Sequence, residues 1–320
     1  MPGFTTHYLF GESTLKQLKN KPAKQLIQKN RAVYNLGLQG PDIFFYCLPA
    51  YAFYMTNIGA VAHTTTTGKF LSYLLESRKI FKTQAEQDIA RAYIMGFYGH
   101  YMLDTNCHPY VYYRSHYHGA TMEYFARHVN LETDIDTFLL QNFLKRNPSE
   151  FPKYNVIALT HLQRKVIASL LYYVYKYVYP QLHVSYAVMY SATYGMQAGN
   201  RILQDKSGKK KVIARKAESY ILGHAYLSPM IVSDTLTFYK DPLNFRHHTW
   251  INPWDRTITS TESFYDLYLK AKQSYVSVLE DLEHLFQLSY SSVEESFAKD
   301  LLNLMGNKSY HSGLDSSIPS

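Results

Sequence analysis

Residues 93–108 read Tyr-Ile-Met-Gly-Phe-Tyr-Gly-His-Tyr-Met-Leu-Asp-Thr-Asn-Cys-His, and Pro109 follows. The stretch carries His100, Asp104 and His108 at steps of four. On an α-helix each such step turns only about 40°, so the three side chains would share one face. His100 and His108 would lie about 12 Å apart along the axis, too far for one ion whose ligand atoms lie about 2 Å from it. We therefore predict at least two metal ions, with Asp104 between them as a bridging ligand.

A second helix, expected over about residues 120–143, can complete one of these sites. His128 and Glu132 lie one turn apart on it, and His108 is a natural third ligand. A lone His-x-x-x-Glu pair is more often an ordinary hydrogen bond, so this motif alone is a weak signal.

His100 and Asp104 need partners for the other ion, and the candidates lie upstream. They are His7, Asp42, which follows Gly40-Pro41 in a turn, and His63, which opens an expected helix. Each of these residues taken singly is more often an ordinary side chain. Three metal-competent groups on one helix face are the stronger signal, because burying them without a metal is costly.

Helix signals dominate the rest of the chain. The sequence Thr83-Gln-Ala-Glu86 is a capping box, so the central helix should begin there, and it should end at Pro109. We expect further helices over about residues 13–29, 63–78, 156–178, 186–203, 212–222, 263–286 and 293–304, with a polar tail from 306. No segment alternates as a strand would. We predict an all-α fold in one helical domain, 1–320, with the metal sites in 1–150 and a helical extension in 151–320.

Composition limits the class of protein and of partner. The 320 residues are 46% hydrophobic and include 31 tyrosines, and the net charge is +8. A basic chain favours anionic partners such as phosphate groups, anionic lipid or nucleic acid. The two cysteines make no disulfide framework, and no signal peptide or transmembrane segment is visible, so we expect a cytoplasmic protein.

Other histidines and the tryptophans leave alternatives open. His116, His118, His247 and His248 could line a cleft, although exposed loop positions are the simpler interpretation. Trp250 and Trp254 could form an aromatic lid or pack in the core.

Read together, these motifs resemble one known family. Gly3-Phe-Thr-Thr-His7, Gly40-Pro-Asp42, His63, the His-x-x-x-Asp-x-x-x-His triplet and the His-x-x-x-Glu pair occur in the order used by the zinc-dependent phospholipase C/D family, over roughly Gly3 to Asp136. In the secreted bacterial phospholipases C and the zinc nucleases of the same fold, the second histidine follows the aspartate by six residues. Here it follows by four, which is similar to the glycosylphosphatidylinositol-specific phospholipase D branch.

The resemblance implies a multi-helix bundle that holds two or three zinc ions. One zinc would bind Asp42, His63, His100 and Asp104, and a second would bind His108, His128 and Glu132. A third, in members that have it, takes Asp104, His7 and the terminal amine. Removal of Met1 would expose Pro2, five residues before His7, as that amine.

The implied activity is phosphodiester hydrolysis of a phospholipid or related substrate, with peripheral membrane contact. A water between two zinc ions has a pKa near neutrality and can attack phosphorus in line, with Asp104 bridging the ions. Asp42 either orients this nucleophile or is only a ligand. Two alternatives are an intracellular nuclease or small-molecule phosphodiesterase, and a non-catalytic helical module stabilised by metal. A ferritin-like di-iron bundle fits poorly, because that class uses Glu-x-x-His.

Overall fold

The structure is a computed structural model that describes residues 3–119, 121–288 and 292–318. It is all-α, as predicted, and its elements are α1 (Phe4–Gln17), α2 (Lys21–Lys29), α3 (Arg31–Gly37), η1 (Gly40–Tyr46), α4 (Leu48–Ala52), α5 (Ile58–Thr64), α6 (Thr67–Glu76), η2 (Ser77–Ile80), α7 (Gln84–Arg114), α8 (Met122–Leu144), η3 (Pro148–Glu150), η4 (Lys153–Asn155), α9 (His161–Val178), η5 (Pro180–Leu182), α10 (Tyr186–Leu203), α11 (Lys210–Ile221), η6 (Ser228–Met230), α12 (Phe264–Gln287) and α13 (Ser292–Met305). The strands in the described part, β1 (Trp250–Ile251) and β2 (Thr259–Ser260), form one short antiparallel pair.

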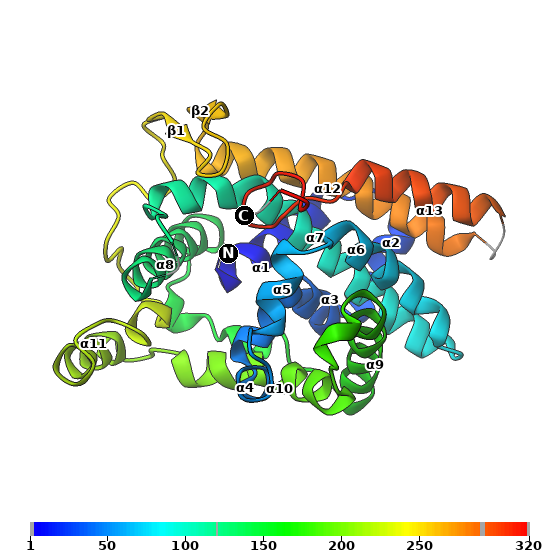
Figure 1. The fold of residues 1–320 in the computed structure, drawn as a ribbon, viewed down its shortest axis with the longest axis horizontal. Helices are drawn as coiled ribbons and strands as arrows, with labels where there is room; N and C mark the ends of the chain where they lie inside the picture. Colours follow the sequence, from blue (N-terminus) through cyan, green and yellow to red (C-terminus); the bar gives the residue numbers. More distant parts are fainter. Residues whose placement is uncertain (1–2, 120, 289–291, 319–320) are drawn as a thin grey trace.

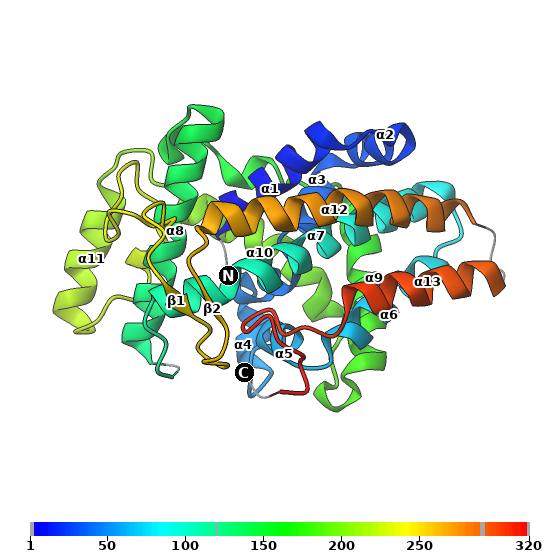
Figure 2. The same ribbon diagram turned by 90° about the horizontal axis from the view of Figure 1, so that it is seen from above.

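The central helix α7 lies in the middle of the molecule, and most of its 31 residues are buried. Helices α1, α3, α9 and α12 pack against it, and Figure 2 shows α12 running beside it. A helix that is apolar on nearly all sides is stable only inside such a shell.

The capping box at the start of α7 is confirmed. The Thr83 hydroxyl accepts a hydrogen bond from the Glu86 N–H at 3.3 Å, and the Thr83 N–H donates to the Glu86 carboxylate at 3.2 Å. The predicted end at Pro109 is wrong, because α7 continues to Arg114. Pro109 cannot donate the helical hydrogen bond to the Thr105 carbonyl, and its ring crowds this carbonyl. Gly313 (φ +67°) packs on this carbonyl, so closely that a Cβ at Gly313 would lie 2.5 Å from the oxygen.

The expected helix over 13–29 is instead two helices, and the first begins at Phe4. Its cap comes from a distant residue. The N–H groups of Thr5 and Thr6 donate to the Asp136 carboxylate of α8, at 3.0 and 2.7 Å. Local sequence cannot reveal a cap 131 residues away. The expected helix from His63 is also divided, because Thr66 adopts φ +49° between α5 and α6.

Two glycines let α3 approach α7 at backbone distance. A Cβ on Gly96 would lie 2.2 Å from the Tyr34 carbonyl oxygen, and one on Gly37 would lie 2.4 Å from the Tyr93 oxygen. The crossing brings the end of α3 and the η1 turn against the face of α7 that carries His100. Gly40 (φ +50°) also lies in close contact with α7, because a Cβ there would lie 2.2 Å from the His100 ring.

The C-terminal segment, residues 306–318, returns to the centre of the molecule. Figures 1 and 2 show it in red beside α5. The Tyr310 N–H donates to the His63 carbonyl at 2.9 Å, so the segment is hydrogen bonded to the end of α5. In the described part of the chain, no helix combines the length and the apolar character needed to cross a lipid bilayer.

We predict that Gly96→Ala destabilises the protein by about 1–3 kcal/mol or more. Alanine would stabilise an isolated helix by about 1 kcal/mol relative to glycine, but here its methyl group collides with a backbone carbonyl. Urea unfolding measures the change. Ser219→Ala, on the exposed side of α11, is the control and should change stability by less than about 0.5 kcal/mol. A Gly96→Ala protein as stable as the parent would contradict the close crossing.

Candidate metal centre

All eight predicted ligands lie together in the interior. His7 comes from α1, Asp42 from η1, His63 from α5, three residues from α7 (His100, Asp104 and His108) and two from α8 (His128 and Glu132). All eight are buried, and Asp104 is 0% exposed. Their ligand atoms form three groups, each within 4.8 Å: His7, Asp42 and His100; His63, His100 and Asp104; and His108, His128 and Glu132.

Asp104 lies at the junction of these groups. Its Oδ1 is 3.1 Å from Nε2 of His7, and its Oδ2 is 3.2 Å from Nε2 of His100 and 3.7 Å from Nδ1 of His108. Oδ2 therefore lies near both ends of the His-x-x-x-Asp-x-x-x-His face, while Oδ1 faces His7 of α1. The two oxygens are thus directed at different imidazoles, as the oxygens of a carboxylate shared by two ions would be.

Asp42 joins the first end of the face. Its Oδ1 is 3.0 Å from Nε2 of His63 and 3.9 Å from Nε2 of His100. Asp42, His63, His100 and Asp104 come from three elements, and their ligand atoms are divided between two groups that share His100. The four-residue set expected for the first ion therefore stays a prediction.

The second end is a separate group. The Glu132 Oε1 is 2.9 Å from Nε2 of His128 and 3.7 Å from Nε2 of His108. One helical turn on α8 supplies a carboxylate and an imidazole, and α7 supplies the second imidazole. A set of two histidines and one glutamate is a common zinc ligand set.

Backbone carbonyls orient the imidazoles by accepting hydrogen bonds from Nδ1–H. The pairs are His63 with Gly59 at 2.7 Å, His100 with Leu38 at 3.1 Å and His108 with Tyr310 at 2.7 Å. His128 Nδ1 lies 2.8 Å from the Tyr124 hydroxyl. Such bonds fix the tautomer and leave each Nε2 lone pair directed at the centre, as in known metal sites.

The atoms that face the centre fit a metal. Among the described residues, Nε2 of His7, His63, His100 and His108, Oδ1 of Asp42 and both oxygens of Asp104 are buried without a hydrogen-bond partner. A buried polar atom without a partner costs about 1–3 kcal/mol, so this many at one place need compensation. Imidazole and carboxylate ligands without sulfur suit zinc. Cys107 is buried beside His108 but belongs to none of the groups.

Burial also sets the charge of the ligands. It lowers the pKa of His7, His63 and His108 to about 4, so these rings are neutral near pH 7 and keep a free lone pair. Burial opposes ionisation of Asp104, yet the imidazoles of His100 and His108 hold the pKa of its carboxyl well below the usual value. Burial raises the pKa of Asp42. Burial also opposes ionisation of Glu132, yet neighbouring groups such as His128 hold the pKa of its carboxyl well below the usual value, so Asp104 and Glu132 are both ionised near pH 7.

The described residues include only part of the ligand set that the resemblance implies for a third ion. His7 is held near Asp104 because Asp136 anchors the start of α1. The Pro2 amine lies outside the described residues, so the terminal-amine ligand stays a prediction.

The tryptophans and the other histidines named in the sequence analysis lie in different environments. Trp250 is buried, and its Nε1–H donates to the Glu262 carbonyl at 2.9 Å, so it is a core residue. Trp254 is partly exposed and packs on Tyr112 with ring centroids 4.7 Å apart, and Tyr112 contacts the His128 ring at 4.9 Å. Trp254 therefore forms part of an aromatic wall beside the centre. His116, His118, His247 and His248 are exposed.

Sequence reasoning missed two residues at the centre, Tyr310 and His311. The Tyr310 ring packs on His63 and His100 at 5.1 and 5.5 Å, and the His311 ring packs on His63 and His108 at 5.8 and 6.1 Å. A dipeptide about 200 residues after α7, in a tail without helical periodicity, gave no signal of this position.

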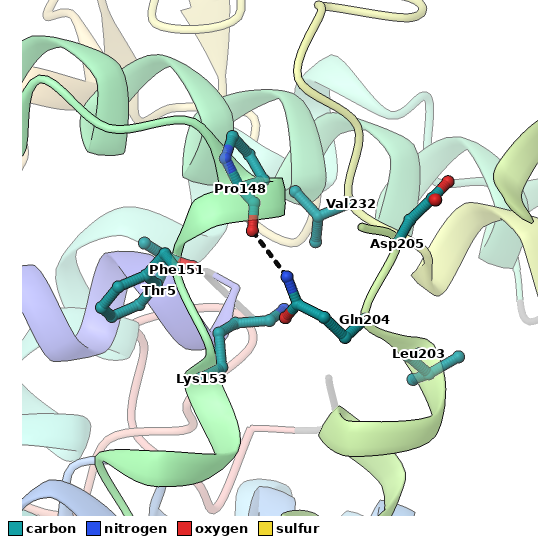
Figure 3. A pocket seen from close by; sticks show the side chains of 8 residues that line it. All are labelled: Thr5, Pro148, Phe151, Lys153, Leu203, Gln204, Asp205 and Val232. Atoms are coloured by element: carbon teal, nitrogen blue, oxygen red, sulfur yellow. Dashed lines mark hydrogen bonds between the residues drawn. The ribbon is translucent and has the colours of Figure 1, made fainter. Parts of the chain in front are cut away.

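A small pocket lies outside the centre. It is lined by Thr5, Pro148, Phe151, Lys153, Leu203, Gln204, Asp205 and Val232, which Figure 3 shows with the hydrogen bond from Gln204 Nε2 to the Pro148 carbonyl at 2.8 Å. None of the eight predicted ligands lines it, so it is not the site of the predicted chemistry.

Comparison with known proteins gives one match. A family model described as zinc dependent phospholipase C matches residues 6–189, a range that includes all eight predicted ligands and excludes Tyr310 and His311. No curated protein and no solved structure matches the chain.

We predict that the metal-free protein loses stability as the pH falls from about 6.5 toward 4. In this range His7, His63 and His108 protonate in the unfolded chain, where the pKa is about 6.5, but not in the fold, where it is about 4. The unfolded state then binds more protons, so the free energy of unfolding falls with pH. The raised pKa of Asp42 acts in the opposite direction, but one carboxyl does not offset three imidazoles.

Urea unfolding after chelation, at pH 7, 6, 5 and 4.5, measures this dependence, and the loss should reach several kcal/mol. His63→Asn should reduce the slope by about one proton. A free energy of unfolding that is flat between pH 6.5 and 4.5 would show that these imidazoles are not buried neutral.

Proposed function

The chain belongs to the zinc-dependent phospholipase C family, and we propose that it hydrolyses the phosphodiester of a phospholipid at the centre around Asp104. The observation that carries this proposal is the convergence of five imidazoles and two further carboxylates around that residue. Several of the buried atoms, among them Nε2 of His63 and both oxygens of Asp104, have no hydrogen-bond partner among the described residues and need cations, and the family is one of zinc-dependent hydrolases.

The proposed ligand sets follow the resemblance given in the sequence analysis. Asp42, His63, His100 and Asp104, which belong to two groups sharing His100, would hold one zinc, and the group of His108, His128 and Glu132 would hold a second. His7 and Asp104 would contribute to a third. When bound, zinc ions supply an acidified water and stabilise negative charge on phosphoryl oxygens.

The chain's own residues do the positioning in this proposal. Asp104 keeps its negative charge without a metal and so draws cations to both of its sides. The carbonyls of Gly59, Leu38 and Tyr310 keep the imidazoles in one orientation, which reduces the reorganisation needed on binding. We assign to Asp42 a role in orienting the attacking water in addition to its role as a ligand.

The segment between Asp42 and His63 supports a lipid substrate. Leu48 and Phe53 are 82% and 74% exposed, and Met55 is exposed too. Apolar side chains of this size, held out by a short helix and a loop beside the centre, suit insertion into a lipid surface. We propose that this segment contacts the membrane from which the substrate is taken, and the net charge of +8 favours an anionic one.

We predict that Asp104→Asn lowers the zinc content by at least one ion per chain and reduces phospholipid hydrolysis by roughly a hundredfold or more. His128→Ala should remove only the ion of the second group. Elemental analysis of the purified protein and an assay of released headgroup provide both readouts. Asp134→Asn is the matched control, since Asp134 is a buried carboxylate of α8 outside the three groups. Wild-type zinc and activity in Asp104→Asn would refute the proposal.

Assays of the same purified protein distinguish a phospholipase from a nuclease and from a non-catalytic module. Phosphatidylcholine, phosphatidylinositol and single-stranded DNA are offered in parallel, and we expect cleavage of a phospholipid only. Cleavage of DNA alone would support a nuclease. Full zinc occupancy with no cleavage of any substrate would support a non-catalytic module whose metals join helices.

We predict that replacing Leu48, Phe53 and Met55 together by serine weakens binding to vesicles of phosphatidylcholine with anionic phosphatidylserine by at least tenfold. Burial of one apolar side chain in the lipid would contribute about 1.5–3 kcal/mol to the free energy of binding, so removing three should weaken vesicle binding strongly. Hydrolysis of a water-soluble phosphodiester should be unchanged. Leu304→Ser, at an exposed position of α13, is the control and should bind vesicles as the parent does. Unchanged vesicle binding by the triple variant would exclude this segment as the contact.

A further inference from the structure

The last described residues form a strap over the metal centre. The strap, residues 307–315, is held on one side by α5 and α7: the Tyr310 N–H donates to the His63 carbonyl at 2.9 Å, and His108 Nδ1–H donates to the Tyr310 carbonyl at 2.7 Å. It thus connects a predicted ligand of the first group with one of the second.

Further hydrogen bonds fix the strap on both sides of this point. The Lys308 carbonyl accepts from the Thr67 hydroxyl at 2.8 Å, and the Ser312 carbonyl accepts from Asn252 Nδ2 at 2.9 Å. Within the strap, the Gly313 N–H donates to the Ser309 carbonyl at 3.0 Å and closes a turn around His311. These hydrogen bonds restrain the backbone on both sides of His311. A binding residue must be held in this way to recognise a ligand precisely.

His311 is the side chain that this turn presents to the centre. Its ring is stacked on His63 and lies edge-on to His108, and a third contact, with Tyr112, places it beside the aromatic wall at 5.1 Å. It borders both groups, yet it belongs to none of the sets of ligand atoms found within 4.8 Å in the described residues. It is also partly exposed, unlike the predicted ligands.

We propose that His311 binds the phosphate group of the substrate, by donating a hydrogen bond from its ring to a phosphoryl oxygen. This inference rests on the function proposed above. A neutral imidazole always carries one N–H donor, and a phosphodiester offers two anionic acceptor oxygens. A phosphate group held at both metal groups must lie where His63 and His108 are both close, and His311 is in contact with both. His311 lies outside residues 6–189, the region that the family model matches.

The test uses the zinc-loaded full chain and inorganic phosphate as the probe. Zinc per chain is measured first, and phosphate affinity is then measured by calorimetry for the parent, His311→Ala and His311→Gln. We expect full zinc content in both variants, about tenfold weaker phosphate binding for His311→Ala, and a smaller loss for His311→Gln, whose amide can donate in place of the imidazole. His224→Ala, at an exposed histidine, is the matched control and should bind phosphate as the parent does.

Two results would overturn the inference. Unchanged phosphate affinity in His311→Ala at full zinc content would show that the ring only packs there. Loss of a zinc ion in both variants would show that His311 is a metal ligand. His311→Gln preserves side-chain volume and polarity, so it keeps the test valid if His311→Ala unfolds.

A kinetic measurement separates this inference from the proposed function. If the parent hydrolyses a phosphodiester, His311→Ala should raise KM more than it lowers kcat. If the parent hydrolyses none, yet binds phosphate in a manner that depends on His311, the proposed function fails and the phosphate site stands.

Discussion

One buried carboxylate, Asp104, is the constraint on which the centre depends. It is fully buried, and its two oxygens face His7, His100 and His108. A charge inside a protein costs several kcal/mol unless it is compensated. The imidazoles of His100 and His108 supply part of this compensation, and cations beside the carboxylate would supply the rest. The metal-free fold therefore stores a cost that zinc binding would repay, so metal binding and folding stability should be coupled.

Several elements of the fold position the imidazoles around this carboxylate. Gly96 and Gly37 let α3 approach α7 closely enough for the Leu38 carbonyl to orient His100. Asp136 caps α1 and so delivers His7. The strap supplies the Tyr310 carbonyl to His108. His7, His100 and His108 are thus positioned by contacts from elements distant in sequence, whereas His63 and His128 are held by contacts within their own helices.

The shared face of His100, Asp104 and His108 could be predicted because a four-residue repeat on a helix needs no tertiary information: the spacing alone places the three side chains on one side. The order of His7, Asp42 and His63 before them could be recognised from a family pattern. The strap could not, since its contribution is a backbone carbonyl and one ring in a segment without periodicity. The continuation of the helix past Pro109 was also missed, because a proline usually ends a helix. In the structure, Gly313 of the strap packs on the Thr105 carbonyl, a contact that the local sequence does not reveal.

Zinc-edge anomalous diffraction from crystals of the purified protein would test the shared role of Asp104 most directly. We expect at least two anomalous peaks: one beside His63 and His100, with a carboxylate oxygen of Asp104 at about 2.0–2.2 Å, and a second among His108, His128 and Glu132. A third peak between His7 and the other oxygen of Asp104 would identify a third ion. Peaks only at the surface, with no ion near Asp104, would show that Asp104 is not a shared metal ligand.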